Sequence, residues 1–189
     1  MVTVTVVDGR TRRGERNRES IIDALIACYD DGILRPSVLQ VAERAGVSAR
    51  SVHNHFVDVE ALRAEVAQRQ WERFSRLAVA IDATRPVAER VELLVAQRSE
   101  IFEGVTPVRR AALLSLPHSP TIAANLARLD RTLRRQIERA FPGTAPDALD
   151  AIDALASWDA WNRLRAAQGV PVLRARRVLT SAICALLET

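Results

Sequence analysis

Apolar residues recur every three or four positions along most of the chain, and this spacing predicts helices. The stretch 18–31 shows the pattern clearly, with Ile21, Ile22, Leu25, Cys28 and Tyr29 on one face before a stop at Gly32. Similar helices are expected over 37–46, 48–56, 58–81, 86–102, 107–116, 120–140, 147–168 and 171–187. We therefore predict an all-α protein of about nine helices, the first three short and close together.

Capping residues and helix breakers set the expected ends of these helices. Ser37 is followed three residues later by Gln40, the pattern of a capping box. Ser48 and Asp58 stand where they can cap the next two helices. Glycine and proline in "EGVTP" (103–107) and the prolines of "PHSP" (117–120) predict interruptions.

The helices expected at 37–46 and 48–56 are joined by Ala45, Gly46 and Val47, a tight turn typical of a helix-turn-helix. Apolar residues of the pair, such as Val41, Val52 and Phe56, are expected to pack against the first helix. The outer face of the second helix then carries polar side chains suited to the major groove, where arginine pairs with guanine and asparagine with adenine. Its candidate residues for DNA contact are Ala49, Arg50, Ser51, His53 and Asn54.

These motifs resemble a known family. "VAERAGVS" (41–48), "SVHNHF" (51–56) and the Asp58, Glu60, Leu62 spacing resemble the N-terminal DNA-binding domain of TetR-family transcriptional regulators, over about residues 16–62. The resemblance implies a homodimer that binds a palindromic double-stranded DNA operator, usually represses, and is released by a small effector bound to residues 63–189. It also places Ser37, Ser48 and His55 near the DNA backbone.

Two positions depart from the family pattern. His53 stands where many members have tyrosine, and Val59 where many have a lysine that grips phosphate. The basic segment "RTRRGERNR" (10–18) offers a replacement, and we expect residues 1–15 to form an N-terminal arm whose Arg10, Arg12 and Arg13 contact DNA. The alternation "VTVTVV" would suit a strand, but a lone strand has no partner.

The C-terminal part carries weaker signals. Arg98 lies beside an apolar stripe, where it can hold the polar end of a largely apolar effector or, the favoured interpretation, extend to solvent. Phe102, Trp158 and Asn162 are further candidates for an effector pocket. A dimer seam and an ordinary core both fit the apolar residues Leu155, Trp161, Leu164, Leu179, Ile183 and Leu186, with a dimer role favoured for part of the set.

Composition narrows the alternatives. The net charge is +4 and all 27 basic residues are arginine. The two cysteines are far apart, no apolar run reaches the roughly 18–20 residues that span a bilayer, and His53 and His55 point to different sides of one helix. We expect a cytoplasmic regulator without cofactor or metal and not an enzyme; an activator, a helical small-molecule-binding enzyme and a protein-binding adaptor are the alternatives.

Overall fold

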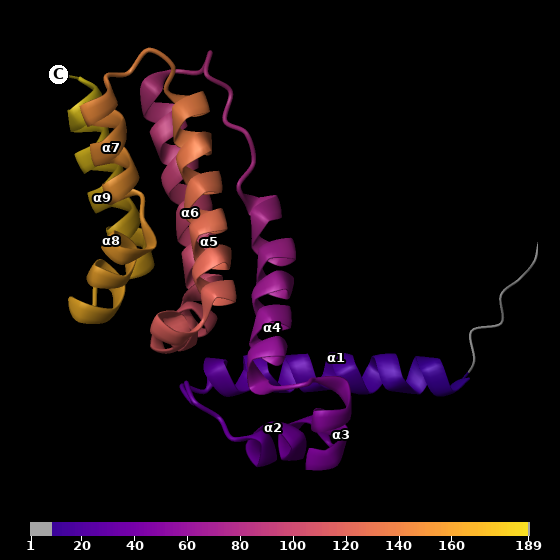
Figure 1. Cartoon of the computed structure of the whole chain (residues 1–189). Helices are drawn as coiled ribbons and strands as arrows, with labels where there is room; N and C mark the ends of the chain where they lie inside the picture. The colour runs from indigo at the N-terminus through magenta and orange to yellow at the C-terminus, as the bar shows by residue number, and fades with distance from the viewer. Residues whose placement is uncertain (1–8, 189) are drawn as a thin grey trace, which may run out of the picture. The chain divides into compact units, whose positions relative to one another are not determined.

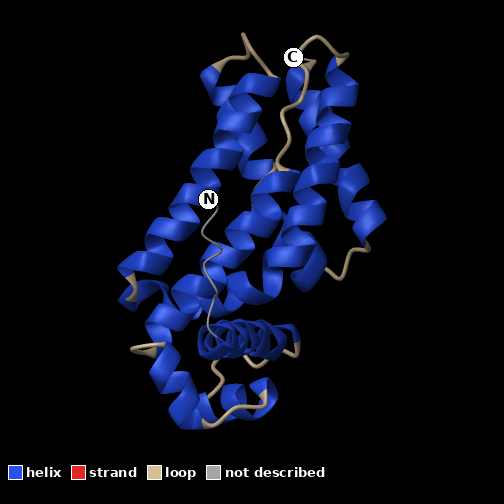
Figure 2. Cartoon of the chain, turned by 90° about the vertical axis from the view of Figure 1, so that its right-hand side faces the viewer, coloured by secondary structure: helices blue, strands red, loops and turns tan. Residues whose placement is uncertain are grey.

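The computed structural model describes the backbone of residues 9–188 and the side chains of residues 12–188. The "VTVTVV" stretch lies outside this range. The described part is built from helices, turns and loops without a strand (Figure 2), which confirms the predicted all-α class. No helix among these residues is both long and apolar enough to cross a membrane.

Figure 1 follows the helices in chain order, and most predicted helices are present. Short 3-10 turns, Ser75–Leu77 and Leu116–His118, follow the fourth and fifth helices, and a π turn, Arg163–Ala167, follows the eighth. The helices are α1 (Gly9–Asp30), α2 (Val38–Ala45), α3 (Ala49–His55), α4 (Val59–Phe74), α5 (Val87–Ser115), α6 (Pro120–Ala140), α7 (Pro146–Leu155), α8 (Trp158–Asn162) and α9 (Val172–Leu187).

Two compact units share the chain, and their boundary differs from the one predicted at residue 62. The first unit runs up to Arg69 and includes Pro107–Ala123. The second unit comprises Gln70–Thr106 and the residues from Ala124 onward. Each has its own apolar core. Separate helical domains were expected, but no sequence signal indicates that Pro107–Ala123 returns to the first unit, because α4, α5 and α6 each run through a boundary without a break.

The predicted N-terminal arm needs correcting. Residues 9–15 belong to α1, which starts nine residues before the predicted helix at 18. Arginine is a good helix former, and side chains here bond back to the helix backbone, as Arg16 Nε does to the carbonyl of Arg12 at 3.4 Å. Polar residues without apolar periodicity therefore extend the helix, and only residues 1–8 of the predicted arm lie outside the described range.

The interruption predicted at 103–107 is also absent, because α5 continues through both Gly104 and Pro107. Gly104 serves close packing: a Cβ built there would lie 2.3 Å from Cε1 of the buried Phe74 ring. Buried apolar residues on both sides of the proline, Val105 and Ala111, hold the helix in the cores of their respective units. Tertiary packing thus outweighs the helix-breaking preference of Pro107.

Two further helix bounds differ from expectation. The single helix predicted over 147–168 is divided by Ser157, whose hydroxyl caps α8 by accepting from the Ala160 N–H at 3.2 Å. The helix predicted to run from 58 to 81 ends at Phe74, so Ile81 is buried from a non-helical segment. In both places, buried apolar residues kept the periodicity while the backbone left the helix.

We expect Gly104→Ala to destabilise the protein by about 1–3 kcal/mol, because the new methyl group overlaps the Phe74 ring in a packed core. Chemical denaturation measures this change. In a Phe74→Ala background the same substitution should be neutral or stabilising, since alanine favours the helix once the ring is gone. Gly14→Ala in α1 is the control: the nearest side-chain atom would be 3.9 Å away, so no loss of stability is expected there.

Candidate nucleic-acid interface and ligand site

The turn between α2 and α3 has the geometry that the sequence predicts. The Gln40 N–H donates to the Ser37 hydroxyl at 3.2 Å, and the Ser37 N–H donates to the Gln40 side-chain oxygen at 2.8 Å. The capping box is therefore confirmed. Gly46 ends α2 in the left-handed region with φ 66°, and the Val47 N–H bonds back to the Ala42 carbonyl at 3.0 Å. These contacts fix the direction in which the chain enters α3.

Helix α3 is buried on one side and open on the other. Val52 and the residue that ends the helix, Phe56, lie in the apolar core of the first unit with residues of α1, α2 and α4. Arg50, His53 and Asn54 are exposed, and the remaining predicted contact residues Ala49, Ser51 and His55 are half-buried. Ser48 caps the helix by accepting the Ser51 N–H at 3.1 Å. The polar side chains are thus presented together on a fixed support.

Ion pairs between α1 and α4 brace this support. Arg18 stands over the Phe56 ring at 5.4 Å from its centroid and pairs with Glu65 of α4 at 2.6 Å. One turn further along α4, Arg69 pairs with two acidic residues of α1, Glu19 and Asp23. The residue that closes α3 is consequently held by a side chain that is itself tied to α4.

The arginines at the start of α1 fall on different faces. The face carrying Gly14 lies beside α3, because a Cβ at Gly14 would be 3.9 Å from the His55 ring. At about 100° per residue, Arg13 lies on the flank of that face while Arg12 lies nearly opposite. Arg12 instead borders a shallow groove with Arg16, Glu19 and Asp23. The side chain of Arg10 lies outside the described residues.

The candidate effector residues occupy the second unit. Phe102 and Trp158 are buried in its core, and Asn162 is half-buried on α8. Arg98 is only 2% exposed, so the favoured interpretation that it extends to solvent is wrong. Burial lowers the Arg98 pKa to about 10, against a smaller opposing effect of Asp153.

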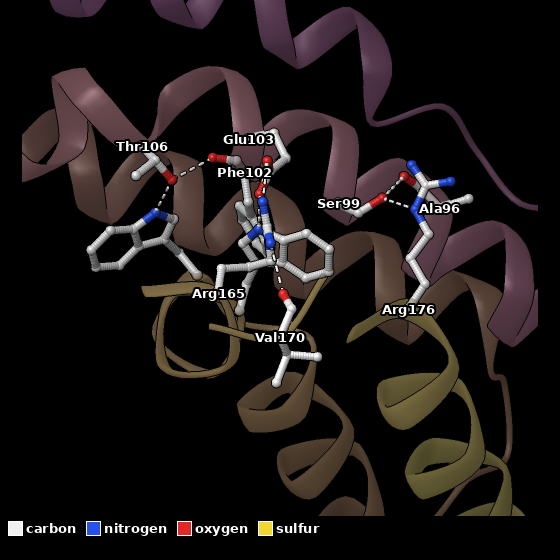
Figure 3. A network of polar contacts seen from close by, with 10 residues as sticks. Ala96, Ser99, Phe102, Glu103, Thr106, Arg165, Val170 and Arg176 are labelled. Carbon is white, nitrogen blue, oxygen red and sulfur yellow. Dashed lines mark hydrogen bonds and ion pairs between the residues drawn. The ribbon is translucent and has the colours of Figure 1, made fainter. Parts of the chain in front are cut away.

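A polar network that the sequence analysis missed joins α5 to the C-terminal helices (Figure 3). The Trp158 indole N–H donates to the Thr106 hydroxyl at 3.0 Å, and the Trp161 indole N–H donates to Glu103 at 2.8 Å. Arg165 donates to both Glu103 carboxylate oxygens and to the Val170 carbonyl. Each buried indole N–H needs an acceptor, and this requirement was the available signal. Glu103 lies in the stretch 103–107, which was predicted to interrupt the helix, so its side chain was not considered as an acceptor.

The predicted dimer residues divide into two groups. Trp161, Leu179 and Ile183 are buried within the single chain and pack in its core, so they have no surface to offer a second copy. Leu155, Leu164 and Leu186 are half-buried beside that core. The sequence left both a dimer seam and an ordinary core open for these residues, and Trp161, Leu179 and Ile183 belong to the core.

Several solved structures share this fold, although no family model and no curated protein matches the sequence. A TetR-family regulator from Streptomyces coelicolor superposes with a TM-score of 0.76 at 18% identity, covering 92% of this chain and 81% of that one. A Rhodococcus sp. transcriptional regulator gives 0.71 at 19%, covering 93% and 96%, and the multidrug-binding protein EbrR with imidazole gives 0.71 at 22%, covering 97% of each.

The chain has the TetR-family fold. At these identities the likeness concerns the fold. The helices α2 and α3 of the first unit are the part of this fold that carries the motifs found in the sequence. The residues assigned to DNA, effector and partner subunit in this TetR-like chain stay predictions.

The Glu103 network predicts an acid-sensitive contribution to the stability of the TetR-like chain. Hydrogen bonds from Arg165 hold the Glu103 pKa below its usual range. The ionised carboxylate therefore stabilises the folded state above the unfolded pKa, about 4.3, and this contribution is lost as pH falls through the lower folded pKa. Glu103→Gln should lower the free energy of unfolding at pH 7, and the deficit should shrink towards pH 3. Denaturation monitored by tryptophan fluorescence measures it. Glu100→Gln, at an exposed site on the same helix, should give a difference in unfolding free energy from the original chain that does not change between pH 7 and pH 3.

Proposed function

We propose that this protein is a transcriptional regulator that binds a palindromic DNA operator as a homodimer and is released by a small effector, most simply as a repressor. The observation that carries the proposal is the two-sided character of α3. Its apolar residues are buried while Arg50, His53 and Asn54 are exposed together on a helix capped at both ends. This is the arrangement with which a recognition helix enters the major groove.

The DNA backbone would be held by groups around that helix. Exposed Ser37 and Ser48 mark the N-terminal ends of α2 and α3, where free N–H groups favour phosphate. Val59 offers no hydrogen bond of this kind. The face of α1 next to His55, with Arg13 on its flank, lies where it can supply the missing positive charge.

The second unit is the proposed effector domain, and a second copy of the chain would bring two recognition helices about 34–36 Å apart, one turn of duplex. An effector that binds better to a conformer with another spacing would shift the population away from DNA. Two of the similar structures are of EbrR with imidazole and with ethidium. That likeness supports a ligand-binding role here. A cytoplasmic location fits such a regulator, and we propose no catalytic activity.

Arg50→Ala and Asn54→Ala should each weaken specific binding by about 1–3 kcal/mol for each base that the side chain contacts, and each should relax the sequence preference. Both side chains are exposed, so thermal stability should not change. The operator is obtained first by selecting bound duplexes from random DNA, and binding is then measured by fluorescence anisotropy. Arg139→Ala, an exposed arginine of α6, is the matched control. If the selection recovers no preferred duplex, or both variants bind like the original chain, the protein acts otherwise, as an adaptor or an enzyme.

The arginines of α1 give a second prediction, based on the dependence of binding on salt. Arg13→Ala should reduce the slope of log K against log salt by about 0.9, the value for one phosphate contact. Arg12→Ala should change it much less, because that residue faces the opposite side of the helix. Titrations of the selected operator between low and physiological salt provide both slopes. Equal slopes for the two variants would contradict the proposed orientation of α1.

A further inference from the structure

Arg98 is a buried cation whose hydrogen bonds to the described residues all go to neutral groups. Its terminal nitrogens donate to the Gln136 side-chain oxygen at 2.7 Å and to the Leu133 carbonyl at 2.8 Å. Its Nε is fully buried and has no hydrogen-bond partner in the described part of the chain. Since a buried charge is normally paired with an opposite one, this site lacks an anion.

The surroundings of Arg98 do not supply that anion at bonding distance. Asp153 acts on Arg98 only through its charge. The Asp153 carboxylate instead lies 3.9 Å from a terminal nitrogen of Arg134. The helix that carries Arg98 places apolar, fully buried side chains one turn to either side, Leu94 and Phe102. A positive group with an unused donor is therefore set in an apolar environment.

The neighbouring glutamines connect this group to a non-helical segment. The Gln136 amide nitrogen donates to the Gln97 side-chain oxygen and to the Val79 carbonyl, both at 2.6 Å. Val79 is 58% exposed and lies in residues 78–86, which form no helix. This segment is thus only two hydrogen bonds from the guanidinium. Segments with few backbone hydrogen bonds open locally more readily than helices, which gives a ligand access.

We propose that Arg98 binds the carboxylate of an apolar monocarboxylic acid, which acts as the effector. The inference rests on the proposed function, because it names the chemical class of the ligand that the second unit takes. The two carboxylate oxygens match two adjacent N–H groups of a guanidinium, here Nε and a terminal nitrogen. A single negative charge balances the single positive one, while Leu94 and Phe102 suit an apolar body. A phosphate dianion would leave a surplus charge in the core.

Binding at Arg98 would also act on residues 78–86, which are linked to Arg98 through Gln136. A carboxylate on Nε and the adjacent terminal nitrogen, which donates to Leu133, neutralises the guanidinium and thereby weakens its bond from the other terminal nitrogen to Gln136, which holds the Val79 carbonyl. Residues 78–86 follow α4 after one 3-10 turn, and only three residues separate α4 from α3. The bound acid thereby changes the restraint on the segment that leads, along the chain, to the recognition helix.

The first test measures thermal stability with a series of straight-chain carboxylates from butanoate to decanoate, and phenylacetate, each compared with its neutral amide. At least one carboxylate should raise the Tm of the full chain by about 2 °C or more, and its amide should not. Arg98→Met should abolish this rise and should itself melt at a higher temperature than the original chain without ligand, because it replaces an unpaired buried charge by an apolar side chain. Arg90→Met on the same helix should keep the carboxylate response. Arg90 also has a buried Nε without a partner among the described residues, but it is only half-buried, donates to the Ala140 carbonyl and lies over the Phe141 ring.

The second test separates this inference from the proposed function. The carboxylate that raises the Tm should reduce binding of the selected operator at least fivefold. The acid should leave operator binding by Arg98→Met unchanged, whatever the affinity of this variant without acid, because the variant lacks the guanidinium. If the chain selects an operator but no carboxylate differs from its amide, or if Arg98→Met melts lower, the inference about Arg98 is wrong while the regulator proposal stands. If no operator is selected but the carboxylate effect depends on Arg98, the acid site stands and the regulator proposal falls.

Discussion

Burial of Val52 and Phe56 is the interaction on which the candidate DNA interface depends. Helix α3 has seven residues, too few to be stable in isolation. Its position comes from outside: Ser48 caps one end, the core of the first unit holds its apolar side, and Arg18 covers Phe56 while pairing with Glu65. In the proposed interface, Arg50 and Asn54 can contact specific bases only because the opposite side of α3 is held in the core.

The helix-turn-helix of the first unit was predictable from sequence because the contacts that begin and end its helices are local. The capping box of Ser37 and Gln40, the caps at Ser48 and Asp58, and the left-handed Gly46 each involve residues at most four positions apart. The capping rules hold at each of these positions. The same rules give the order of the helices, so the fold class followed from the pattern alone.

The second unit was predicted less well because its contacts join residues far apart in sequence. In the sequence, Gly104 and Pro107 indicate an interruption of the helix. The structure shows instead that Gly104 leaves room for the Phe74 ring, which packs against the helix there. Trp161 fits a dimer seam until its indole is seen to donate to Glu103, 58 residues away. Helical periodicity tells that a side chain is buried. It does not tell whether the cover comes from the same chain or from another, nor where the backbone stops being helical.

Arg98 is another residue whose surroundings the sequence could not predict, and the structure shows what those surroundings are. An arginine beside an apolar stripe ordinarily reaches solvent or a carboxylate, and both would stabilise the fold. This one has neither at bonding distance among the described residues, whereas Arg165 in the same unit has a two-pronged partner in Glu103. An apolar residue at this position would make the fold more stable, since a buried unpaired charge costs several kcal/mol of folding free energy. Sites that keep this kind of cost are typically sites that bind something, because the missing partner then arrives with the ligand. In the first unit Arg18 and Arg69 are paired with carboxylates that brace the support of α3. In the second unit the buried Arg98 has no anion at bonding distance among the described residues, and the proposed acid would supply it.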